Sequence, residues 1–203
     1  MRQSNFLVIA LGAVVAFTML PLAASAEFDT EIVSLDLVGA DPFFGNGLIH
    51  VGVEGAGNPS IGQVQSAAGG LSFFDVYPKI TIDDCGSGSV ELTLDASEDP
   101  VHLEANIASL PPANAEEYID AAAVTKLLNS NNPACVLLGL ALEIKHSLPP
   151  GGPDSVIDHG GGVLEYTYEF TQAQIQIELD GGGLVPLAVS GPVTILSQPS
   201  RSP

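Results

Sequence analysis

The clearest pattern in this sequence is an alternation of apolar and polar residues with a period of two. It runs through residues 89–95, 101–107 and 163–170. Such alternation is typical of antiparallel strands that bury one face. The side chains predicted to face the core are Val90, Leu92, Leu94, Val101, Leu103, Ala105, Ile107, Leu164, Tyr166, Tyr168 and Phe170.

Weaker strand patterns occur elsewhere and bring the expected total to about nine or ten strands. They cover residues 31–38, 48–54, 76–83, 136–145, 174–179 and the apolar pieces of 184–197. Two segments rich in Gly and Pro, Gly55–Gly70 and Ser147–Gly152, are expected to be long loops. Short strands joined by Gly, Pro and Asp turns predict an all-β fold, an antiparallel sandwich or Greek key.

One segment predicts a helix instead of a strand. Residues 114–129 begin with a potential N-cap, Asn114, and carry Glu116 and Glu117 in the first turn, where the helix dipole favours acids. A run of Ala follows, and Pro133 lies just beyond. We therefore expect one α-helix over residues 114–129, packed on the sheet.

The first 26 residues have the order of a secretory signal peptide. Arg2 precedes the uncharged apolar run 6–20, and Ala24-Ser25-Ala26 is an A-x-A cleavage site. The apolar run is shorter than the roughly 20 residues that span a bilayer. The sequence thus predicts a signal peptide over 1–26, one sandwich-like domain over 27–197 and a disordered tail over 198–203. The mature protein is expected in the periplasm or outside the cell, with no membrane attachment after cleavage.

The net charge of the chain narrows the classes of partner that the protein can bind. The chain has 24 Asp and Glu against 5 Lys and Arg, and loss of Arg2 would leave a net charge of −20. So acidic a surface repels phosphate, which argues against nucleic acid as a partner. Because 46% of the residues are hydrophobic, the chain is nevertheless expected to fold.

The two cysteines, Cys85 and Cys135, allow one intramolecular disulfide. Exported proteins meet oxidising conditions, which favours that bond over two free buried thiols. Closing a loop of this length would stabilise the fold by about 4 kcal/mol in the chain-entropy model.

The densest acidic segment is 95–100. Asp95, Ser97 and Asp99 match the first three ligand positions of an EF-hand loop, but Pro100 stands where that loop needs Gly, and Asn106 where it needs Glu. A polar hairpin turn is the favoured interpretation, and a weak calcium site is the alternative. No other cofactor is indicated.

Catalytic motifs are sparse. Asp158 and His159 precede three glycines, and Asp180 precedes a second glycine triplet, so these three residues are the candidates for a secreted hydrolase. No G-x-S-x-G nucleophile elbow accompanies them. Sugar-binding aromatic platforms are scarce, and core packing is the favoured role for the pairs Phe43-Phe44 and Phe73-Phe74.

The segment Phe28–Leu37, with its D-T-E-I-V-x-L-x-L stretch, resembles the start of a group of uncharacterised exported proteins from planctomycete-like bacteria. This resemblance implies export and does not imply any activity. Together, the residues predict an exported module that binds an unknown ligand or has a structural role without catalysis. The alternatives are the hydrolase and the weak calcium-binding domain.

Overall fold

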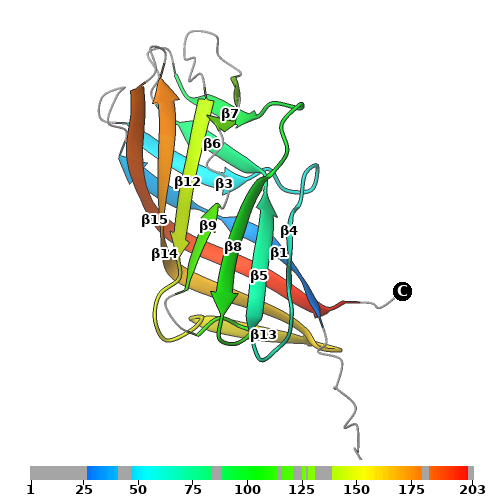
Figure 1. Cartoon of the computed structure of the whole chain (residues 1–203). Helices are drawn as coiled ribbons and strands as arrows, with labels where there is room; N and C mark the ends of the chain where they lie inside the picture. Colours follow the sequence, from blue (N-terminus) through cyan, green and yellow to red (C-terminus); the bar gives the residue numbers. More distant parts are fainter. Residues whose placement is uncertain are drawn as a thin grey trace, which may run out of the picture.

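The computed structural model describes residues 27–40, 47–83, 88–113, 116–120, 125–126, 128–130, 139–179 and 183–200. The predicted signal peptide, both cysteines, Asp180 and the Phe43-Phe44 pair lie outside these residues. All paired strands are antiparallel, which confirms the all-β, sandwich-like fold class (Figure 1). The strands are β1 (Phe28–Leu35), β2 (Leu37–Ala40), β3 (Leu48–Val53), β4 (Ser60–Val64), β5 (Gly70–Val76), β6 (Pro78–Ile82), β7 (Val90–Leu94), β8 (Val101–Ile107), β9 (Glu117–Asp120), β10 (Thr125–Lys126), β11 (Leu128–Ser130), β12 (Gly139–Ser147), β13 (Ser155–Gly160), β14 (Val163–Leu179) and β15 (Gly183–Pro199).

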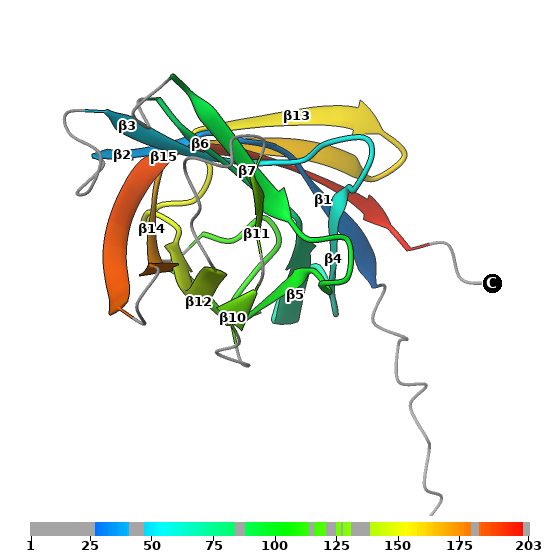
Figure 2. The same cartoon turned by 90° about the horizontal axis from the view of Figure 1, so that it is seen from above.

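All of these strands except β10, which pairs with β12, follow one hydrogen-bonded path, β11-β7-β6-β3-β2-β15-β1-β4-β5-β8-β9-β12-β14-β13. In addition, β14 pairs with β15, although the two strands are far apart along this path. This pairing brings the two ends of the stretch β15-β1-β4-β5-β8-β9-β12-β14 together, so these strands surround the core. Figure 2 looks down on this arrangement. The core consists of inward side chains of these strands and of β2, β3, β6 and β7, mostly Val, Ile and Leu, together with Tyr118, Tyr166 and Tyr168.

The two 17-residue strands, β14 and β15, pair with each other, and each also pairs with other strands of the sheet. Their register shifts between Tyr168 and Thr171, and such a bulge bends a strand and changes which face its side chains occupy. Next to the bend, Gly191 lies so close to the backbone of Asp36 that a Cβ there would collide with it. The absence of a side chain at this position allows β2 to cross close to β15.

The strongest sequence patterns predict their strands correctly. Every predicted core side chain of 89–95 and 101–107 is buried, as are Tyr166 and Tyr168. Phe170, however, is 55% exposed, and the prediction that it faces the core was wrong. The bulge after Tyr168 turns Phe170 outward, and Thr171 is buried instead.

The predicted helix over 114–129 was wrong. The described part of that segment forms β9, β10 and β11. In β9, Tyr118 and Asp120 face inward while Glu117 and Ile119 face outward, which is the alternation of a strand. Pairing of β9 with β8 and β12 outweighs the local helix signals, because the strand buries Tyr118 against Phe74.

Two other expectations need correction. The supposed loop Gly55–Gly70 contains β4, which pairs with β1 and β5. The disordered tail predicted for 198–203 was wrong for its first three residues, because Gln198 and Pro199 belong to β15 and the Ser200 amide donates a hydrogen bond to the Glu27 carbonyl. Residues 201–203 lie outside the described residues. Within the described residues, no helix is long and apolar enough to cross a membrane.

Candidate functional site

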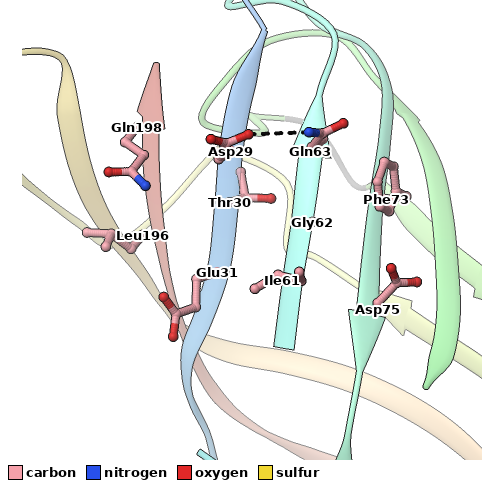
Figure 3. Close-up of a pocket in the computed structure, with 10 residues that line it drawn as sticks. All are labelled: Asp29, Thr30, Glu31, Ile61, Gly62, Gln63, Phe73, Asp75, Leu196 and Gln198. Carbon is pink, nitrogen blue, oxygen red and sulfur yellow. Dashed lines mark hydrogen bonds between the residues drawn. The ribbon is translucent and has the colours of Figure 1, made fainter. Parts of the chain in front are cut away.

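An open groove of about 400 Å³ lies on the outer face of β15, β1, β4 and β5 (Figure 3). We call it the outer groove. The residues that line it are Asp29, Thr30, Glu31, Ile61, Gly62, Gln63, Phe73, Asp75, Leu196 and Gln198. Segments of β15, β1 and the consecutive strands β4 and β5 meet here, because strand pairing places them side by side.

Strand register explains the composition of the groove. Glu165, Leu196, Glu31, Ile61, Asp75 and His102 are successive cross-strand partners from β14 to β8. We call this line of residues the outer row. Acidic and aliphatic side chains alternate along its first five positions. Neighbouring strands lie about 4.8 Å apart, so the carboxylates of Glu31 and Asp75 flank Ile61 at strand positions about 9.5 Å apart.

The second line of partners runs beside the outer row and includes Gln198, Asp29, Gln63 and Phe73. Gln63 Nε2 donates a hydrogen bond of 3.3 Å to Asp29 Oδ1, drawn as the dashed line in Figure 3. The Ser200 hydroxyl lies 2.7 Å from the same carboxylate oxygen. These contacts hold the Asp29 carboxylate at the rim of the groove.

The floor between β1 and β4 depends on Gly62. Its missing side chain leaves room for the Thr30 hydroxyl, which would lie 2.9 Å from a Cβ at position 62. A Cβ would also collide with the backbone oxygen of Phe73 on β5. The Thr30 side chain itself is buried, and its hydroxyl has no hydrogen-bond partner in the described part of the chain.

A histidine between two carboxylates adjoins the groove. His102 Nδ1 lies 2.7 Å from Asp75 Oδ1, and Nε2 lies 3.0 Å from Glu104 Oε1. The hydrogen bond to Asp75 is the main cause that raises the pKa of His102 above its usual 6.5; partial burial lowers it, and Glu104 raises it further. The ring also packs against Phe73, with centroids 5.2 Å apart. Protonation of His102 would therefore place a positive charge beside a groove carboxylate.

Two of the three candidate catalytic residues from the sequence, Asp158 and His159, lie outside the outer groove. Asp158 and His159 lie on β13, where Asp158 Oδ1 accepts the Gly160 amide at 2.7 Å and His159 Nε2 lies 3.1 Å from Glu165 Oε2. Neither residue lines the outer groove. Asp180 lies outside the described residues.

The candidate calcium residues also have a local structural role. Asp95 Oδ1 accepts hydrogen bonds from the Ser97 amide and hydroxyl at 2.9 and 2.6 Å, and Asp99 is exposed. The loop is not a hairpin, because β7 pairs with β6 and β11 while β8 pairs with β5 and β9. Among the residues that the structure describes, no cluster of three His, Cys, Asp or Glu side chains is arranged to hold a metal ion.

Sequence reasoning missed the groove and assigned Phe73 to the core. Phe74 is indeed buried, but Phe73 lines the groove. The adjacent pair contained the signal, since neighbouring residues of a strand point to opposite faces. Comparison of the chain with protein-family models, curated proteins and solved structures finds no match.

Proposed function

We propose that this protein is an exported, non-catalytic binding module whose ligand occupies the outer groove. The observation that carries the proposal is the composition of that groove: Asp29, Glu31 and Asp75 lie among Ile61, Phe73 and Leu196. Neither Lys nor Arg is among the described residues that line it. The ligand that suits this lining has a positive charge and an apolar portion.

Each part of such a ligand has a partner in the groove. An ammonium or guanidinium group fits beside Glu31 or Asp75, while an aliphatic or aromatic portion covers Ile61, which is 53% exposed. At 4 Å in a water-like dielectric, each ion pair contributes about 1 kcal/mol, or roughly fivefold in affinity. Burial of the apolar portion adds about 25 cal/mol per Å².

The lining also favours binding over catalysis. Its described residues include no Ser, Cys, Lys or His, and its one hydroxyl side chain, Thr30, is buried. Binding requires only the charge and the apolar surface that the groove provides. Export is supported by the amino-terminal sequence, where the A-x-A site follows an apolar run.

Calorimetric titration with phenethylammonium tests this function, with phenylacetate as the anion of similar shape. We expect phenethylammonium to bind and phenylacetate not to bind. The double variant Glu31→Gln with Asp75→Asn should weaken binding by about fivefold or more, because the ion pair of the ammonium group is lost whichever of the two carboxylates it contacts. Glu169→Gln, on an exposed residue outside the groove, is the control and should bind as the wild type does. Equal binding of the two probes, or unchanged binding by the double variant, would refute the proposal.

A further inference from the structure

The strand β13 has an open edge. All six of its residues are exposed, and β14 is its only partner in the described structure. Half of the backbone N–H and C=O groups of a strand point away from a single neighbour, so this edge presents hydrogen-bonding groups to solvent. The other strand at the end of the path, β11, has only three residues.

The edge lacks most of the features that normally protect a sheet from further pairing. Such features include Lys and Pro residues and bulges on the edge strand. β13 contains neither Lys nor Pro, and its register shift lies at the hairpin end, between Asp158 and Gly160. The segment 155–158 pairs regularly with β14 and presents Val156 and Ile157, 50% and 51% exposed, on opposite faces.

Charge identifies the kind of strand that this edge can accept. The sequence between Lys145 and Arg201 contains no Lys or Arg. Asp154 and Asp158 lie on or next to β13, Glu165 lies in the part of β14 that pairs with β13, and Glu169 lies two residues beyond that part. Edge-to-edge pairing of two copies would bring two such sets of carboxylates together, which disfavours a second copy at neutral pH. The same carboxylates would attract an incoming strand that carries basic residues.

We infer that β13 is a docking edge for an extended, basic segment of another protein, which adds a strand to the sheet. Main-chain hydrogen bonds to the free edge would hold the segment, and its side chains would select it. On each face an aliphatic side chain is available for contact, Val156 on one and Ile157 on the other. The carboxylates Asp158 and Glu165 would attract Lys or Arg on the same segment.

This inference is independent of the proposed function, because the edge and the groove are separate. Ile157 and Ile61 belong to the same line of cross-strand partners but lie four strand steps apart, about 19 Å. Their exposed fractions are nearly equal, 51% and 53%. Ile157→Lys and Ile61→Lys are therefore a matched pair that distinguishes the two surfaces.

Fluorescence anisotropy with the labelled peptide Lys-Val-Val-Lys-Lys-Val tests the inference. The Glu-Val-Val-Glu-Glu-Val peptide is a probe that differs in charge. Two further probes are N-methylated forms of the basic peptide, one methylated at odd positions and one at even positions. We expect the basic peptide to bind and the acidic peptide not to bind. One N-methylated form should fail, because methyl groups on that side block the main-chain hydrogen bonds. Ile157→Lys should weaken binding by at least about tenfold and Ile61→Lys by less than about twofold.

Several results would overturn the inference. Equal binding of the basic peptide and both N-methylated forms would show side-chain attraction without strand addition. Unchanged binding by Ile157→Lys would place the peptide elsewhere, and loss of binding in Ile61→Lys alone would place it in the outer groove. A wild-type dimer in sedimentation that Ile157→Lys converts to a monomer would assign the edge to a second copy.

Discussion

His102 should make both the stability of the fold and the affinity of the outer groove depend on pH. Its hydrogen bond to Asp75 is the main cause of its raised pKa in the folded protein. A raised folded-state pKa means that the native protein binds this proton more tightly than the unfolded chain does. The added stability is therefore fully present below the unfolded pKa of 6.5 and is lost as pH rises through the folded pKa.

The size of this stabilisation follows from the exposure of His102 and from its distances to the two carboxylates. The ring lies 2.7 and 3.0 Å from two carboxylates, but 42% of the His102 side chain is exposed, so water screens both ion pairs. Exposed pairs contribute about 0.2–1 kcal/mol each, which gives about 1 kcal/mol for the protonated state. For a domain of this size, that corresponds to a change in melting temperature of about 2–4 °C.

Thermal unfolding of wild type and His102→Gln between pH 5 and pH 8 measures the effect. Wild type should exceed the variant most at pH 5, and the difference should shrink towards pH 8. His159→Gln, which removes another outward histidine, is the control and should give a smaller change. A wild-type advantage that is constant or grows with pH would refute the reasoning.

The same protonation should oppose binding in the groove. A positive His102 neutralises Asp75, so the affinity of wild type for phenethylammonium should fall by up to about fivefold between pH 8 and pH 5. His102→Gln has no titrating ring at this position, and its affinity should change less over the same range. If both proteins lose affinity equally, the effect does not come from His102.

Three further predictions concern the fold. Tyr168→Phe should lower the free energy of unfolding by about 1–3 kcal/mol in urea titration, because it leaves a buried carbonyl without its 2.6 Å hydrogen bond; a loss under about 0.5 kcal/mol would contradict this. Gly62→Ala should destabilise by about 1–3 kcal/mol, because the methyl group collides with the backbone of β5, whereas Gly57→Ala, with nothing near, should be nearly neutral; equal effects would argue against the collision. Unreduced, denatured protein should show no free thiol at Cys85 and Cys135, and reduction should lower its melting temperature; labelling of both residues before reduction would rule out the disulfide.

The sequence predicts a strand well where burial on one side is complete. Residues 101–107 alternate because one face of β8 is buried in the core and the other is more exposed, so pattern and structure agree. The segment 114–129 misled because its Ala run and acidic start are local features. The strand β9 is stabilised by pairing with two strands that are distant in sequence, and local features cannot reveal such pairing.

The outer groove illustrates the same limit. Its alternation of acidic and aliphatic side chains appears only when strands β14, β15, β1, β4 and β5 lie next to one another in register. Nothing in the spacing of Glu31, Ile61 and Asp75 along the chain indicates this order. Both Phe73 and Phe74 were assigned to the core, although neighbouring residues of a strand point to opposite faces, and Phe73 lines the groove.

Backbone amide NMR during titration with phenethylammonium shows whether the outer groove is the binding site, because it locates the ligand. We expect chemical-shift changes to concentrate at residues 29–31, 61–63, 73–75 and 196–198, the strand segments that line the outer groove. These changes should disappear in the Glu31→Gln, Asp75→Asn double variant. Changes that centre on residues 154–160 instead, or that persist in the double variant, would show that the ligand does not occupy the groove.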